Sequence, residues 1–196
     1  TLIIIPSRLS AKRLPGKPLM KINNISIISH VFKKAEKANI GEVLVATEDQ
    51  EIIDEVKRNG GQAILTKRDH RTGTDRIYEA LKKLDSSKID LIMNLQGDEP
   101  LMNIEDIRNL HSQMVKHKKV ELGTLASTIE NKKFYEDQNV VKVITKEKLS
   151  FENFPESINF TREILNQNRN IYHHLGIYCY QLETLKKFVS NKQSTN

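Results

Sequence analysis

Short apolar runs alternate with amphipathic stretches along the first half of the chain. The runs are four to six residues long and resemble strands buried on both faces: residues 2–5, 42–47, 62–65 and 90–95. Between them, apolar positions recur every three or four residues, as on one side of a helix, over 25–39, 49–59 and 76–84. This alternation predicts an α/β fold: a Rossmann-like, mostly parallel sheet with helices on both faces.

Capping residues mark the ends of these helices. Ser26 and Asp49 stand where the first two helices should begin, and Gly60-Gly61 where the second should stop. Either Thr72 or Thr74 can cap the third helix, which would leave backbone N–H groups facing the carboxyl edge of the sheet.

The second half of the chain carries less regular patterns. We expect a helix, a strand, a short helix, two further strands and a last helix, over residues 104–115, 121–129, 131–137, 139–144, 171–180 and 181–189. Residues 150–170 have no clean period. Lys142 stands among apolar residues, and we expect its ammonium to reach solvent from an edge strand. No repeat or linker divides the 196 residues, which predicts a single domain.

Composition narrows the class of protein. Hydrophobic residues make up 38% of the chain, and no apolar run approaches the roughly 20 residues of a membrane-spanning helix. A single cysteine, Cys179, excludes an internal disulfide and fits a reducing compartment, so we expect a cytoplasmic protein. Both ends look cut, and we expect the sequence to be a fragment.

The net charge of +6 indicates an anionic partner. A nucleic-acid binder is disfavoured because aromatic residues make up only 6%, tryptophan is absent and no basic run is interleaved with aromatics. The cations are densest over residues 8–17 and 67–76, which suits a small polyanion held at one site better than a polymer.

The loop after the first strand is the strongest candidate for that site. It carries four cations within ten residues, Arg8, Lys12, Arg13 and Lys17, and Pro-Gly-Lys-Pro stiffens its second half. A solvated surface loop is the alternative, but such a loop gains nothing from rigidity. Neither a P-loop nor a G-x-G-x-x-G pattern is present, so any phosphate binding here is of another kind.

Two carboxylates follow the strand that ends near residue 95. In Gln96-Gly97-Asp98-Glu99-Pro100, glycine leaves room and proline fixes the exit. Mg²⁺ takes one or two carboxylates together with substrate phosphates, which makes Asp98 a candidate ligand. Alternatively, Asp98 caps the helix that starts near Ile104. For Glu99 we expect a structural role, in which its carboxylate bonds loop amides.

Three segments together resemble the sugar cytidylyltransferases, and among them the CMP-Kdo synthetases (3-deoxy-manno-octulosonate cytidylyltransferases) of Gram-negative bacteria. They are I-I-P-S-R-L-S-A-K-R-L-P-G-K-P-L, N-L-Q-G-D-E-P and H-L-G-I-Y-C-Y. The resemblance covers most of the chain. It implies a nucleotide-diphospho-sugar transferase fold. It also implies Mg²⁺-dependent transfer of CMP from CTP to a 2-keto-3-deoxy sugar acid, with release of pyrophosphate. The CMP-sugar formed would serve lipopolysaccharide biosynthesis.

The same resemblance implies roles for particular residues. Residues 1–129 would bind the nucleotide and 130–196 the sugar acid. Arg8, Arg13 and Lys17 would neutralise the triphosphate, Asp98 would hold Mg²⁺, and Thr72, Thr74 and Arg76 would contact the base and ribose. Gln96, Arg162, His174 and Tyr178 would orient the sugar acid. Because no side chain stands out as a general base, we expect metal-assisted ionisation of the sugar hydroxyl.

Departures from the family pattern leave alternatives open. The family's proline after the position of Arg162 is missing, and so is a carboxyl-terminal G-V-D-T-P-E-D-L that supplies a second metal ligand. We therefore expect these 196 residues to bind CTP better than they turn it over. Relatives suggest a homodimer. The alternatives are another sugar-acid nucleotidyltransferase, such as a CMP-sialate synthetase, and a non-catalytic nucleotide-binding module.

Overall fold

The computed structural model describes residues 1–10, 14–131, 133–163 and 170–191. They form two compact units, Thr1–Gly123 with Ile177–Asn196, and Thr124–Gly176. The described residues after 129 are therefore divided between the units, because residues 177–191 belong to the first one. Within the described ranges, no helix combines the length and apolar character needed to span a bilayer.

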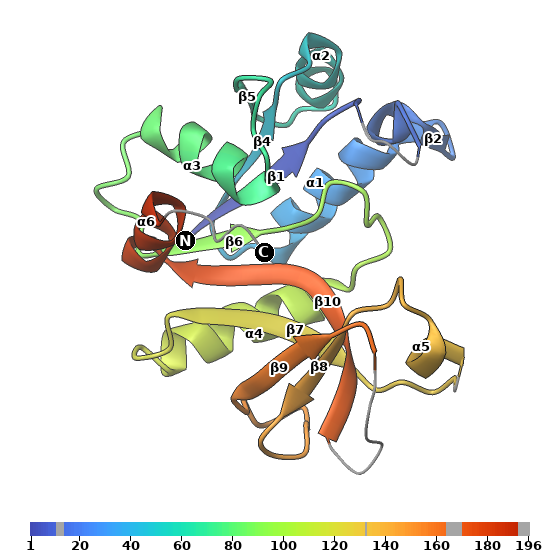
Figure 1. Cartoon of the computed structure of the whole chain (residues 1–196). Helices are drawn as coiled ribbons and strands as arrows, with labels where there is room; N and C mark the ends of the chain where they lie inside the picture. The colour runs from blue at the N-terminus through green and yellow to red at the C-terminus, as the bar shows by residue number, and fades with distance from the viewer. Residues whose placement is uncertain (11–13, 132, 164–169, 192–196) are drawn as a thin grey trace. The chain divides into compact units, whose positions relative to one another are not determined.

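The first unit is built on the predicted parallel sheet (Figure 1). Its parallel strands lie in the order β5 (Ala63–Leu65), β4 (Glu42–Thr47), β1 (Leu2–Ser7) and β6 (Leu91–Asn94). The end of β10 (Asn170–Gln181) adds an antiparallel partner to β6, with Tyr178 opposite Asn94. The mostly parallel α/β sheet expected from the sequence is confirmed.

Helices cover this sheet and bury its apolar side chains. On one face, α3 (Gly73–Lys82) and α6 (Leu182–Ser190) pack on a cluster that includes Ile4, Ala46 and Ile92. The alternate residues of β1 are equally buried, and α1 (Ile27–Ala38) contacts β1, β4 and α4 (Ile104–Lys116). Buried runs without a polar face are what a sheet between two helical layers requires.

Helix starts follow the local chemistry at two of the three predicted caps. The Ser26 hydroxyl accepts the amide of Ser29 at the start of α1. Thr72 begins α3 with a capping box to Asp75. Asp49 does occupy the cap position of α2 (Gln50–Arg58), but its carboxylate makes no capping bond there and points elsewhere, as described below.

The sequence patterns missed a small hairpin after the first loop. The 3-10 turn η1 (Lys17–Leu19) leads into β2 (Lys21–Ile22) and β3 (Ile25–Ser26). Asn23 and Asn24 form the turn with positive φ of 50° and 63°. Asparagine tolerates this left-handed backbone better than most residues, which explains why two of them stand in sequence here.

The second unit contains a smaller antiparallel arrangement. Here β8 (Lys142–Thr145) lies between β9 (Ser157–Thr161) and the beginning of β10, and the unit also holds α5 (Lys133–Glu136) and most of β7 (Leu122–Ser127). The strand β9 lies in the stretch that showed no period.

The expectation for Lys142 is wrong. This side chain is fully buried on a central strand instead of reaching solvent from an edge strand. Its ammonium donates to the backbone carbonyls of Asp137 at 2.6 Å and Arg162 at 2.9 Å. These acceptors compensate for part of the cost of removing the charge from water.

Candidate functional site

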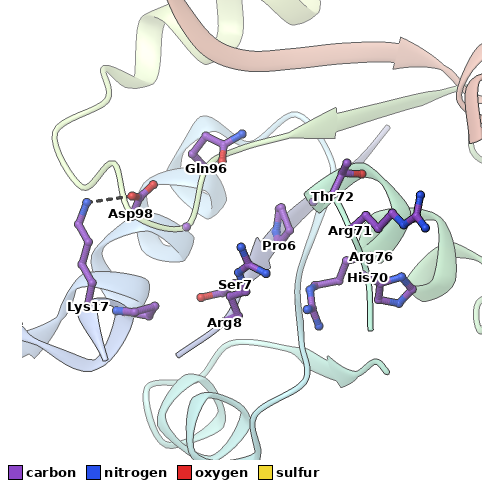
Figure 2. A pocket seen from close by; sticks show the side chains of 13 residues that line it. Pro6, Ser7, Arg8, Lys17, His70, Arg71, Thr72, Arg76, Gln96 and Asp98 are labelled. Atoms are coloured by element: carbon purple, nitrogen blue, oxygen red, sulfur yellow. Dashed lines mark hydrogen bonds and ion pairs between the residues drawn. The ribbon is translucent and has the colours of Figure 1, made fainter. Parts of the chain in front are cut away.

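A pocket of about 300 Å³ lies in the first unit where β1 and β6 end and α3 begins. In parallel α/β sheets, this carboxyl edge is where ligands bind. Figure 2 shows Ser7 and Arg8, at the end of β1, between Lys17 and Asp98 on one side and His70, Arg71 and Thr72 on the other. The lining residues are Pro6, Ser7, Arg8, Lys17, Pro18, His70, Arg71, Thr72, Gly73, Arg76, Gln96, Gly97 and Asp98.

Lys17 and Asp98 meet at this pocket. The Lys17 Nζ and the Asp98 Oδ2 are 2.9 Å apart, although 81 positions separate the residues in sequence. Lys17 opens η1 after Gly16, whose φ of 74° is a left-handed backbone that glycine adopts without strain. Both side chains remain partly exposed, at 33% and 51%, so the pair adds little to stability. It leaves both groups at the pocket wall.

Gly97 allows the segment after β6 to approach β1. A Cβ atom at this position would lie 2.9 Å from the Pro6 carbonyl oxygen and 3.3 Å from the Ser7 side chain. Any larger residue would push Gln96 and Asp98 away from the end of β1. The sequence predicted that Gly97 leaves space, and the structure shows that this space lets the backbone after β6 lie close to the end of β1.

The alternative role for Asp98 as a helix cap is wrong. Asn103 caps α4, with its side-chain oxygen accepting the amide of Glu105 at 3.0 Å. Burial raises the pKa of the neighbouring Glu99, and the charge of Asp98 raises it further. Glu99 does not line the pocket, and among the described lining residues Asp98 is the one carboxylate, the type of group that a hard cation takes as a ligand.

Arg76 lines the pocket but its guanidinium is already engaged. It pairs with Glu48 in a buried ion pair and donates to the Thr66 hydroxyl at 2.5 Å and the Lys67 carbonyl at 3.2 Å. The residue is only 3% exposed. These contacts fasten α3 to the end of β4 and give Arg76 a structural task, whatever it contributes to ligand binding.

The loop before α3 is held by one carboxylate of that helix. Glu79 accepts the amide of Lys67 at 3.0 Å and also pairs with His70 and Lys83. Burial by itself would raise the pKa of Glu79, but the hydrogen bonds from Lys83, the Lys67 amide and His70 outweigh it and lower the pKa to about 2. Thr72 and Gly73 then present the amino end of α3 to the pocket, where its dipole favours anions.

Several lining residues were not among the expected ligands. Ser7, His70 and Arg71 line the pocket, and the high cation density over 67–76 was the signal for the last two. Within the described residues, the buried Ser7 hydroxyl has no hydrogen-bond partner, which is uncommon for a buried polar atom. Nothing in the local sequence indicates this orphaned hydroxyl.

Other expected ligands lie away from this pocket. Thr74 is outside the lining; burial raises the pKa of Tyr180, and the Thr74 hydroxyl lowers it. Tyr178 packs beside the cluster under α3 and α6, and burial raises the pKa of its phenol. Arg13 falls outside the described residues.

Two expected sugar-acid ligands belong to the second unit. The His174 imidazole lies 2.9 Å from the Thr124 hydroxyl and packs edge-on against the Phe160 ring. Burial lowers the pKa of His174, and the charge of His173 lowers it further. Arg162 donates to the carbonyls of Gln138 and Asn139. Through these two bonds, Arg162 holds the segment after β9 against the turn before β8.

The chain matches a family model described as cytidylyltransferase over residues 2–195. A 3-deoxy-manno-octulosonate cytidylyltransferase from Nitrobacter winogradskyi is 40% identical over 195 residues, covering 96% of this chain and 74% of that protein. One from Rhodopseudomonas palustris strain BisB18 is 41% identical, covering 97% and 77%.

The structures agree with the sequences. The fold matches a CMP:2-keto-3-deoxy-manno-octonic acid synthetase solved with CTP, with a TM-score of 0.87, 32% identity, and coverage of 99% of this chain and 79% of that one. The likeness extends over both compact units and is not confined to the pocket. The chain therefore belongs to the cytidylyltransferase family of nucleotidyltransferase enzymes, among the 3-deoxy-manno-octulosonate cytidylyltransferases.

Proposed function

We propose that this protein transfers CMP from CTP to 3-deoxy-D-manno-octulosonate, forming CMP-Kdo and pyrophosphate for lipopolysaccharide biosynthesis. The single observation that carries the proposal is the Lys17–Asp98 pair, which brings an ammonium and a carboxylate together at one pocket. The names of the relatives supply the two substrates.

The cations of the pocket would bind the triphosphate. The Lys17 ammonium has three N–H donors, so its bond to Asp98 leaves capacity for phosphate oxygens. Arg8 and the amino end of α3 face the same space. Attack on an α-phosphorus surrounded by negative charge is favoured by such fixed positive groups, which also stabilise the departing pyrophosphate.

The residues present fit a magnesium ion. Asp98 offers a half-exposed carboxylate, and Mg²⁺ binds proteins through one or two such groups plus substrate phosphates. When bound, the ion would neutralise phosphate charge and polarise the reacting centre.

Gln96 is the described lining residue best suited to the sugar acid. It lies two residues after the end of β6, and its side-chain amide can both donate and accept hydrogen bonds. Arg162, His174 and Tyr178 remain proposed ligands of the same substrate, on the strength of the family resemblance alone.

Turnover by the purified protein tests the proposal. We expect CTP, 3-deoxy-D-manno-octulosonate and Mg²⁺ together to yield equal amounts of CMP-Kdo and pyrophosphate, resolved by anion-exchange chromatography. A sialic acid in place of the sugar acid should give no product. Faster turnover of the sialic acid would instead support a CMP-sialate synthetase, and CTP binding without any product would support a non-catalytic module.

A further inference from the structure

Two carboxylates at the end of β4 hold the cationic loop in place. Asp49 stands at the first cap position of α2, where its carboxylate would ordinarily accept a helix amide. Instead, its Oδ2 accepts the backbone N–H of Leu9 at 2.7 Å, 40 positions away in sequence. Helix α2 therefore lacks a side-chain capping bond, and the Asp49 carboxylate instead holds the loop next to Arg8.

Glu48 provides a second attachment to the same loop. One carboxylate oxygen accepts the Ser10 hydroxyl at 3.2 Å, and the other pairs with the buried guanidinium of Arg76. The loop that carries Arg8 is thus tied to β4 through two neighbouring residues, and through Glu48 to α3.

The anchor continues to the other pocket cation. The carbonyl of Leu9, whose amide Asp49 holds, accepts the amide of Gly16 at 3.0 Å. Gly16 directly precedes Lys17, which reaches Asp98. A continuous set of hydrogen bonds therefore runs from Asp49 through Leu9 and Gly16 to the two residues on which the proposed function depends.

We propose that Asp49 is a positioning residue for nucleotide binding: it fixes the backbone of the loop so that Arg8 and Lys17 face one pocket. This inference rests on the proposed function. It does not require Asp49 to touch the nucleotide, and a carboxylate near a triphosphate would by its charge alone weaken binding. The observed contact of Asp49 is with the Leu9 backbone next to Arg8, which a geometric role explains.

The sign of the effect separates the two roles. If Asp49 acted only through its charge, Asp49→Ala and Asp49→Asn would both tighten CTP binding. If it acts through the Leu9 amide, Asp49→Ala weakens CTP binding by about tenfold, the worth of a charge-assisted hydrogen bond. Asp49→Asn keeps an acceptor oxygen, and its CTP affinity should stay within about threefold of that of the unaltered protein.

Asp54→Ala is the matched control and should leave CTP affinity unchanged. It removes an exposed carboxylate of α2 that is bonded only to Gln50 among the described contacts.

A double-mutant cycle with Arg8→Ala excludes a merely structural effect. Because Asp49 acts on both Arg8 and Lys17 through the loop, Asp49→Ala should weaken CTP binding by a smaller factor once the Arg8 guanidinium is gone, and the factor that remains is the share carried by Lys17. A loss of stability spread over the whole unit would cost the same in both backgrounds. KM for CTP should rise in Asp49→Ala while KM for the sugar acid is unchanged.

Calorimetric titration of CTP into the purified variants gives the outcome. Tenfold weaker CTP binding in Asp49→Ala, recovery in Asp49→Asn and a smaller effect of Asp49→Ala in the Arg8→Ala background support the inference. Unchanged or tighter binding in Asp49→Ala overturns it while leaving the proposed function intact. Failure of the unaltered protein to bind CTP overturns both.

Discussion

Lys17 Nζ and Asp98 Oδ2 lie 2.9 Å apart at the mouth of the pocket, joining the loop after β1 to the segment after β6. A bound triphosphate and its metal would separate this cation from this anion, which here neutralise each other. The pair is therefore best understood as two halves of a ligand site held ready, since an exposed ion pair contributes only about 0–1 kcal/mol to folding.

The two members of this pair should respond differently to replacement. Lys17→Ala should weaken CTP binding at least about tenfold with or without Mg²⁺, because a charge-assisted bond to phosphate is lost. Asp98→Asn should tighten CTP binding in the absence of Mg²⁺, since it removes a like charge and releases Lys17, yet lower turnover by at least about a hundredfold, the scale of losing one group that stabilises the transition state.

Calorimetry with EDTA and initial-rate assays with Mg²⁺ separate these effects. Lys116→Ala, on an exposed helix end, is the control for a change of charge alone. Weaker metal-free CTP binding in Asp98→Asn would contradict the assigned roles.

The buried pair of Glu48 and Arg76 should matter for stability. Their side chains are 7% and 4% exposed, so Glu48→Ala would leave a guanidinium without its charged partner in the interior. Breaking a buried pair in this way costs about 3–5 kcal/mol, which urea denaturation can measure. Glu51→Ala, on the exposed first turn of α2, should change the free energy of unfolding by less than about 0.5 kcal/mol. Equal effects of the two replacements would show that the pair contributes nothing.

Glu79 should make folding stability depend on pH. Its pKa falls from 4.5 to about 2 on folding, so the folded state prefers the ionised carboxylate. This contribution is complete above the unfolded pKa and is lost as the pH falls towards the folded one. Between pH 5 and pH 3, the unaltered protein should lose about 2 kcal/mol more than Glu79→Gln does. Parallel stability curves for the two proteins over this range would rule out a depressed pKa.

Ser7 offers a test of the pocket wall. Its buried hydroxyl has no partner among the described residues, so Ser7→Ala should raise the free energy of unfolding of the ligand-free protein, by about 1 kcal/mol. If a bound nucleotide supplies that partner, CTP should stabilise Ser7→Ala less than the unaltered protein in thermal melts with and without CTP. A destabilised Ser7→Ala would mean that the hydroxyl is satisfied in the folded state.

Local chemistry explains why much of this fold can be predicted from the sequence. Ser26 and Thr72 cap their helices because a hydroxyl next to free amides has few better partners. The buried strands follow from apolar runs without a polar face, and the strand ends then bring Lys17 and Asp98 to one edge. Convergence at that edge required only the parallel sheet and the two loops.

Long-range contacts explain what could not be predicted. Asp49 has the sequence context of an ordinary cap, and only the folded chain brings the Leu9 amide close enough to compete for it. Lys142 is buried because carbonyls of Asp137 and Arg162 surround its ammonium, and Arg162 lies 20 positions away. The strand β9 is largely exposed, so it has no buried face to give it a period.

The most direct test of the account is a calorimetric titration of CTP into the unaltered protein and Lys17→Ala, each with and without Mg²⁺. We predict that the unaltered protein binds CTP more tightly than UTP or ATP, that Mg²⁺ strengthens this binding, and that Lys17→Ala loses at least about tenfold in affinity. Equal CTP affinity in the two proteins, unaffected by Mg²⁺, would contradict the claim that Lys17 and Asp98 converge on a triphosphate.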